Sequence, residues 1–303
     1  MKLIESKAEY IPQKEGLEGI YKQIELAGRT CYKSEDKITE GSAKAFVERM
    51  IKSGHTAMLE HGTVYLEGYG DYPMSTLIRD YNDNKYSKLK TASSNSRSIL
   101  GVAVTTNYRV LVENNLLDGL KYVCSPTESH EKRYTMRFTC SRAIAQELTR
   151  HRTFSFLMES QRYINYSKER HGREITYIKP LWLNCSYEDI PPQSELCYLA
   201  KQHPDEAAHR FIASLVESKY AYMTLLQKGC TPQQARDVLP NATKTELIMT
   251  GFASDWRHVL DLRLFEKTGA VHPDMKDLMQ KAQKAMQEAG IWEDLMSKSS
   301  KFE

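Results

Sequence analysis

The spacing of apolar residues along the chain predicts several amphipathic helices. In residues 42–53, Ala43, Phe46, Val47 and Met50 recur at the i, i+3, i+4 and i+7 spacing of a single helix face. Further helices are predicted at residues 15–29, 109–124, 205–229, 231–239, 253–265 and 273–288, of which two are ended by Gly229 and Pro240. Long helices therefore make up much of the predicted structure.

Alternation of side-chain character predicts strands between these helices. In residues 132–140, Tyr134, Met136, Phe138 and Cys140 share one face of the strand. Shorter strands are predicted at residues 63–67, 101–106 and 243–249. Because helices and strands do not alternate strictly, the pattern favours an α+β fold over a doubly wound parallel sheet.

Two segments interrupt the pattern. Residues 70–98 are rich in Gly, Asp, Asn, Ser and Lys, and we expect a long surface excursion with at most a short helix near residues 75–81. Residues 180–204 contain four prolines and are expected to form an irregular insertion. No linker divides the chain, so we predict a single domain over residues 1–303 with insertions at about 70–98 and 180–204.

Composition and charge exclude some classes of protein. Lys+Arg 42 against Asp+Glu 39 gives a net charge of +3, too weak to indicate a nucleic-acid-binding protein by itself. No apolar run reaches the roughly 18 residues of a membrane span, and the N-terminus lacks the apolar region of a signal peptide. Six scattered cysteines without a C-x-x-C pair are typical of a reducing compartment. We therefore expect a cytoplasmic protein with neither a membrane nor a nucleic acid as partner.

The segment that most strongly indicates a binding site is residues 146–163, where Arg150, His151 and Arg152 are consecutive. Ser141 is predicted to cap a helix that runs to about Arg152. Three consecutive side chains on a helix spread through about 200°, so these cations would hold two anionic partners rather than one. Guanidinium and hydroxyl groups bind phosphate well, which favours a nucleotide beside a larger cofactor. The alternative is a solvated basic helix end opposing the helix dipole.

Common phosphate-binding, metal and hydrolase motifs are absent from the sequence. There is no G-x-x-x-x-G-K-[ST], no G-x-G-x-x-G after a strand, no H-E-x-x-H and no G-x-S-x-G. His55, Glu60 and His61 form a weak candidate for a metal site, but their spacing would point the side chains in different directions. No metal is expected.

The order of several motifs resembles the flavin-dependent thymidylate synthase family. Arg150-His151-Arg152, seven residues, Ser160 and then Gln161-Arg162-Tyr163 are similar to that family's R-H-R-x7-S signature and its extension. Further blocks follow the family order, at residues 54–61, ending in Glu-His, at 235–240, reading Ala-Arg-Asp-Val-Leu-Pro, and at 256–263, ending in Leu-Arg. The resemblance implies the fold of thymidylate synthase complementing proteins, an antiparallel sheet with long helices.

The resemblance also implies an activity. It is the reductive methylation of dUMP to dTMP, with 5,10-methylenetetrahydrofolate as carbon donor, FAD as hydride carrier and NADPH as reductant. No protein nucleophile is required in that scheme, and family members are homotetramers with shared active sites.

Site residues follow from the same resemblance. For dUMP they are Glu147, Arg150, Glu159, Ser160, Gln161, Arg162, Arg236 and Arg263. For FAD they are His55, Glu60, Arg150, His151, Arg152 and His258. Arg263 would be the catalytic residue, lying against the uracil edge and favouring ionisation at N3, and Arg236 would come from another subunit. The residues themselves also allow Arg263 a simple salt bridge, to Asp237 or Glu60.

Some positions depart from the family pattern. Leu157-Met158 replaces a common Asn-Glu pair, Ala57 stands where a flavin-contacting Thr is common, and Phe252 and His258 stand where two Asn residues often contact FAD. These departures motivate a rival hypothesis, a nucleotide-binding homologue that lacks flavin.

The basic segment and the thiols each support one more hypothesis. A nucleic-acid-binding module would use the basic segment with the aromatic rings of Phe154, Phe156 and Tyr163. A cysteine-dependent thymidylate synthase would need an activated thiol near basic groups, and Cys140 before Arg142 is the candidate. Cys140 is more simply a packed thiol on a strand face.

Overall fold

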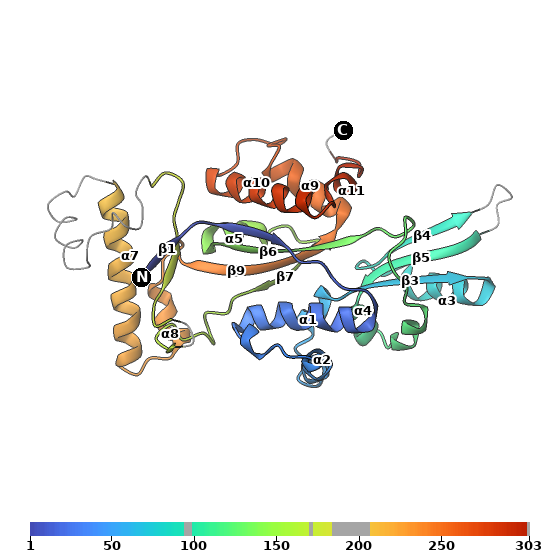
Figure 1. The fold of residues 1–303 in the computed structure, drawn as a ribbon, viewed down its shortest axis with the longest axis horizontal. Coiled ribbons are helices and arrows are strands. Elements are labelled where there is room, and N and C mark those ends of the chain that lie inside the picture. Colours follow the sequence, from blue (N-terminus) through green and yellow to red (C-terminus); the bar gives the residue numbers. More distant parts are fainter. Residues whose placement is uncertain (94–98, 170–171, 184–206, 302–303) are drawn as a thin grey trace.

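The computed structural model describes residues 1–93, 99–169, 172–183 and 207–301. Its centre is a four-stranded antiparallel sheet in the order β2-β6-β9-β7 (Figure 1). The strands are β2 (Lys7–Tyr10), β6 (Arg133–Ser141), β9 (Lys244–Phe252) and β7 (Ser155–Met158). The two long strands pair over their whole length, with Arg133 opposite Phe252 and Ser141 opposite Lys244.

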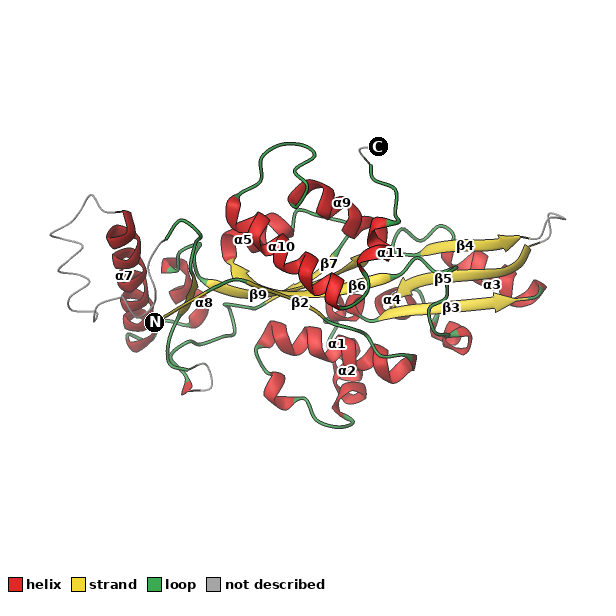
Figure 2. Cartoon of the chain, turned by 45° about the horizontal axis from the view of Figure 1, so that its top comes forward, coloured by secondary structure: helices red, strands yellow, loops and turns green. Residues whose placement is uncertain are grey.

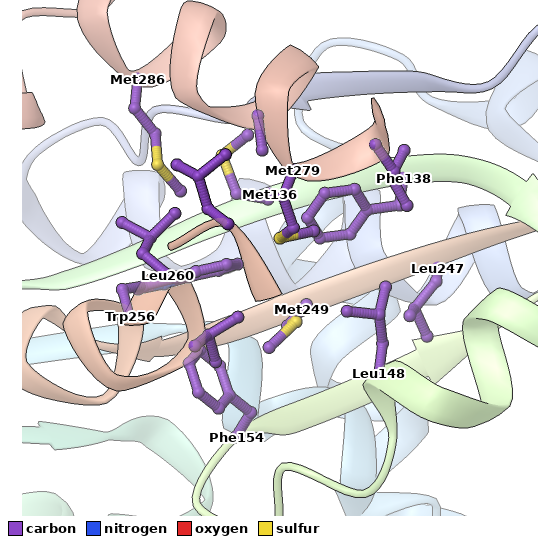
Figure 3. Close-up of a cluster of buried hydrophobic side chains, with 14 of the residues drawn as sticks. Met136, Phe138, Leu148, Phe154, Leu247, Met249, Trp256, Leu260, Met279 and Met286 are labelled. Atoms are coloured by element: carbon purple, nitrogen blue, oxygen red, sulfur yellow. The ribbon is translucent and has the colours of Figure 1, made fainter. Parts of the chain in front are cut away.

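One face of this sheet is covered by the C-terminal helices (Figure 1). These are α9 (Ala253–Arg263), α10 (Pro273–Glu288) and α11 (Trp292–Met296). The predicted strand face of Tyr134, Met136, Phe138 and Cys140 is buried here, against residues such as the fully buried Trp256 (Figure 3). The cluster also includes the buried side of α5 (Arg142–Leu148).

The opposite face packs against α1 (Gly16–Tyr32), and α2 (Ser42–Lys52) packs on α1 farther from the sheet (Figure 1). Helix α2 buries Ala43, Phe46, Val47 and Met50, the four residues of its predicted apolar face. Short 3-10 turns at Glu35–Lys37 and Thr56–His61 follow these two helices. Gly28 allows the close approach of α1, because a Cβ there would lie 2.6 Å from the Phe46 ring.

A second sheet extends beyond the first (Figure 2). It has the order β3-β5-β4 and consists of β3 (Thr63–Tyr69), β5 (Ile99–Asn107) and β4 (Lys88–Ser93). Helix α3 (Asp71–Tyr81) packs on it through Met74, Leu77 and Tyr81. The predicted short helix near residues 75–81 is confirmed and begins earlier, at Asp71. The prediction that the rest of residues 70–98 is a surface excursion is wrong for Lys88–Ser93, which form an edge strand of the second sheet.

The predicted helix over residues 109–124 is also wrong in its length. The structure has α4 (Tyr108–Glu113) and then a separate 3-10 turn at Leu117–Tyr122. Between them Asn115 adopts a left-handed conformation with φ 58°, which an α-helix cannot contain.

The third part of the chain lies at the far end of the long sheet (Figure 1). Here β1 (Lys2–Ile4) pairs in parallel with β8 (Thr176–Ile178), beside α7 (Ala207–Gln227). Helix α8 (Pro232–Ala235) and a 3-10 turn at Arg236–Val238 follow α7. Most of the predicted insertion at 180–204 lies outside the described residues.

The predicted α+β class is confirmed, since mixed helices pack on antiparallel sheets. The chain carries no helix, over the residues described, with the length and apolar character needed to cross a membrane.

Candidate active site

The Arg150–Arg152 segment follows a helix rather than continuing it. Ser141 caps α5 as predicted, with its Oγ accepting from the Ile144 N–H at 3.3 Å, but the helix ends at Leu148. The prediction of a helix to Arg152 is therefore wrong. The chain reverses here so that β7 can pair with β9, and Phe154 packs on Gly251, where a Cβ would lie 2.4 Å from its ring.

Three predicted site residues meet at this reversal. Arg263, at the end of α9, places its Nε 3.3 Å from His151 Nε2 and its Nη1 3.5 Å from a Glu147 carboxylate oxygen. Burial lowers the pKa of His151 to about 4, and the neighbouring guanidinium groups of Arg263 and Arg150 contribute to the decrease. The imidazole is therefore neutral at neutral pH, and its Nε2 accepts a hydrogen bond from Arg263.

The salt bridge considered for Arg263 has a different partner from those predicted. Arg263 pairs with Glu147, not with Asp237 or Glu60. Glu147 is itself predicted to contact the nucleotide, so this pairing joins two predicted site residues. Arg150 and Arg152 nearby are exposed, and neither forms an ion pair with any residue that the structure describes.

Glu159 lies at the centre of a buried ionic network. Its side chain is 3% exposed, and its carboxylate lies 2.8 Å from Lys244 Nζ, 3.1 Å from the Tyr166 hydroxyl and 3.8 Å from Lys33 Nζ. Burial acts to lower the pKa of Lys244, but Glu159 and Glu246 outweigh it and raise the pKa to about 12. Lys244 therefore stays charged and neutralises Glu159.

The network supports the loop that follows Glu159. The Ser160 N–H donates to the Cys31 carbonyl at 3.0 Å, which ties the loop to the end of α1. Arg162 Nε donates to Gln233 Oε1 of α8 at 3.2 Å, and its guanidinium lies 5.5 Å from the Tyr163 ring. The loop thus packs beside the segment that carries Arg236, whose Nε lies 3.9 Å from Asp237.

Two predicted FAD residues lie on the connection between α2 and β3. His55 is exposed and its Nδ1 lies 3.3 Å from the Tyr32 hydroxyl. Glu60 forms an ion pair with Arg109. The third predicted FAD residue outside the signature, His258, is half-buried on α9, and burial lowers its pKa.

Sequence reasoning missed a buried arginine beside Glu60. Arg133 donates to the Glu60 carbonyl at 3.2 Å, and its guanidinium lies 5.5 Å from the Phe252 ring. Burial lowers its pKa to about 10. Phe252, one of the departures from the family pattern, is thus already packed against a cation of this chain.

One rival interpretation loses its chemical basis, and another loses one of its three aromatic rings. Burial raises the pKa of the Cys140 thiol to about 12, so it is not an activated nucleophile. Phe154 is buried with its ring centroid 4.8 Å from Trp256, so it is not available to stack on a base.

Comparison with known proteins decides the family. A model described as thymidylate synthase complementing protein matches residues 123–289, more than half of the 303 residues. This chain belongs to that family. The match includes the whole signature, Arg236 and Arg263, and it confirms the family, and with it the enzyme class, expected from the sequence.

Several relatives are named flavin-dependent thymidylate synthase. The protein of Corynebacterium efficiens is 26% identical over 249 residues, which cover 80% of this chain and 67% of the relative. That of Mycobacterium avium is 32% identical over 128 residues, covering 42% of this chain and 47% of the relative.

Solved structures were also compared. The UMP/dUMP methylase PolB of Streptomyces cacaoi, bound with 5-Br dUMP, has a TM-score of 0.42 at 17% identity, over 98% of this chain and 97% of that chain. Thymidylate Synthase X of Helicobacter pylori, with FAD and dUMP, has a TM-score of 0.38 at 16% identity, over 97% of this chain and 100% of that chain.

Proposed function

We propose that this chain catalyses the reductive methylation of dUMP to dTMP, with 5,10-methylenetetrahydrofolate as carbon donor, FAD as hydride carrier and NADPH as reductant. Family membership supports the reaction class. The observation that carries the proposal is that Arg263, at the end of α9, meets Glu147 and His151, which lie at the end of α5 and just after it.

The residues present fit a flavin nucleotide. Arg150 and Arg152 are exposed and form no ion pair within the described residues, so their guanidinium groups are available to phosphate oxygens. His151 is held neutral by burial, which allows it to donate or accept a hydrogen bond at a polar ring edge. His55, Glu60 and His258 complete the proposed FAD set. When bound, the flavin supplies hydride-transfer chemistry.

The chain's own contribution is positioning and electrostatics. Glu147 and His151 both contact the Arg263 guanidinium, which restricts its orientation. A fixed cation at the uracil edge would stabilise negative charge that develops on the ring.

The nucleotide would be held at its other end by the loop after β7. Ser160, Gln161 and Arg162 would bind its phosphate, and Arg150 would lie between nucleotide and flavin. Glu159 is also part of the proposed dUMP set, and its buried ion pair with Lys244 indicates that it acts mainly by holding the loop in place.

The assembly and location are further parts of the proposal. We propose a homotetramer in which Arg236 reaches the nucleotide of another subunit. A reducing, cytoplasmic location agrees with the free state of the four described cysteines, Cys31, Cys124, Cys140 and Cys230.

An omission assay tests the proposed function. Purified protein given dUMP, methylenetetrahydrofolate, NADPH and FAD is expected to form dTMP. Product formation should stop when dUMP, methylenetetrahydrofolate or NADPH is left out, or when protein stripped of its flavin receives no FAD. If the protein binds dUMP but neither binds flavin nor forms dTMP, the chain is instead a flavin-deficient nucleotide-binding homologue.

A further inference from the structure

Arg142 carries a charge that no described residue neutralises by direct contact. It is the first residue of α5, and its Nη1 atom is buried without a hydrogen-bond partner. Its guanidinium forms no ion pair anywhere in the described ranges of the chain. Arg142 as a whole is half-buried, but a cationic nitrogen that is buried without a partner is unfavourable, so this position indicates an anionic ligand.

The backbone holds Arg142 beside the segment that carries Arg236. The Arg142 N–H donates to the Thr243 carbonyl at 3.0 Å, and the Ala143 N–H donates to the Asn241 carbonyl at 3.3 Å. Helices α5 and α8 accordingly lie at the same end of the long sheet (Figure 1). Burial lowers the pKa of Arg142, and the cation of Arg236 lowers it further.

The nearest carboxylate is already engaged. Glu159 lies close enough to affect the pKa of Arg142, but its oxygens are bound by Lys244 at 2.8 Å and by Tyr166 at 3.1 Å. Arg236 has Asp237 at 3.9 Å, so Arg142 is the one of these two arginines that has no carboxylate in direct contact among the described residues.

A second buried hydrogen-bond donor, on Gln161, also has no acceptor among the described residues. Gln161 is 7% exposed and lies beside the Tyr166 hydroxyl, yet its Nε2 has no acceptor at hydrogen-bonding geometry. Gln161 belongs to the loop that would bind the nucleotide phosphate, and Tyr166 also neighbours Arg142. Both unsatisfied groups are donors, which a ligand rich in acceptor oxygens would satisfy.

We propose that Arg142 is a further binding residue for the phosphate monoester of the nucleotide, acting with Gln161 from the side of the loop opposite Arg162. This inference rests on the proposed function. It adds a residue that lies eight positions before the signature arginine Arg150.

Removing the charge tests the proposal. Arg142→Gln is expected to weaken dUMP binding by about tenfold or more, the effect of losing a charge-assisted phosphate contact. Binding of 2′-deoxyuridine, which has no phosphate, should be unchanged. Titration calorimetry of both ligands with flavin-loaded protein measures the two affinities. Arg79→Gln, an exposed arginine on the distant helix α3, is the matched control for the loss of one positive charge.

The outcomes separate this inference from the proposed function. If wild-type protein binds no dUMP, the proposed function itself fails. If wild type binds dUMP and the Arg142→Gln variant binds it equally well, or loses dUMP and deoxyuridine alike, the role of Arg142 is refuted. Arg142→Lys should keep part of the dUMP affinity, since it retains the charge, which a purely packing role would not predict.

Discussion

Replacement of Arg263 by alanine is expected to lower kcat for dTMP formation by about 10²- to 10³-fold, while the protein keeps its bound flavin. Arg263 is the only residue of the candidate site, within the described part of the chain, that contacts both Glu147 and His151. Those two contacts orient the guanidinium. Of the two partners only His151 belongs to the proposed FAD set, and the other FAD residues, such as Arg150 and Arg152, do not depend on Arg263. Loss of Arg263 should therefore affect the chemical step more than cofactor binding.

Steady-state kinetics with flavin occupancy measured in parallel check this prediction. Arg162→Ala is the comparison variant, because Arg162 lies on the phosphate loop and its loss should chiefly raise KM for dUMP. Arg263→Lys keeps the charge but not the planar fork, and it should recover little of the lost rate. Near-normal turnover by the Arg263→Ala enzyme would refute the catalytic role.

Replacement of Lys244 by methionine is expected to lower the free energy of unfolding by about 3–5 kcal/mol. The change leaves the buried carboxylate of Glu159 without the cation that now lies 2.8 Å away. Both side chains are almost fully buried, at 3% and 8% exposure, so solvent cannot replace the lost partner. The double variant Lys244→Met, Glu159→Gln removes both charges and should recover much of the loss.

Urea unfolding of wild type, the two single variants and the double variant gives the coupling between the two residues. Lys44→Met is the matched control, because Lys44 forms an exposed pair with Glu48 at 4.0 Å and should contribute little. A Lys244→Met variant within about 1 kcal/mol of wild type would show that the network does not hold the loop.

The parts of the fold that follow from local pattern were predictable. Helix α2 and strand β6 each bury the four residues that the spacing selects. Helix α3 was predicted only as a short helix near residues 75–81, because the polar and turn-forming residues around it hid the apolar face of Met74, Leu77 and Tyr81. Strands β1, β2, β7 and β8 have three or four residues each, too short for a periodicity, and they exist only because distant segments pair with them.

Some features of the candidate site were likewise predictable from the sequence, and others were not. The signature and Arg263 could be selected because their motifs resemble a known family. The end of α5 at Leu148 could not, since it depends on Phe154 packing against Gly251 and Trp256 far along the chain. Lys244 had one signal, since alternation in its strand places it with Glu246 on the face opposite Thr245 and Leu247. That signal shows a polar face but not the buried carboxylate that Lys244 meets.

The most direct test of the proposed function is the absorption spectrum of the flavin with and without dUMP. A yellow protein is predicted, whose flavin is released on denaturation. Addition of dUMP should produce a saturable change in the flavin band, because both ligands would contact the cations around Arg150 and Arg263. A colourless protein that takes up no added FAD, or a flavin band that dUMP leaves unchanged at every concentration, would contradict the proposed function.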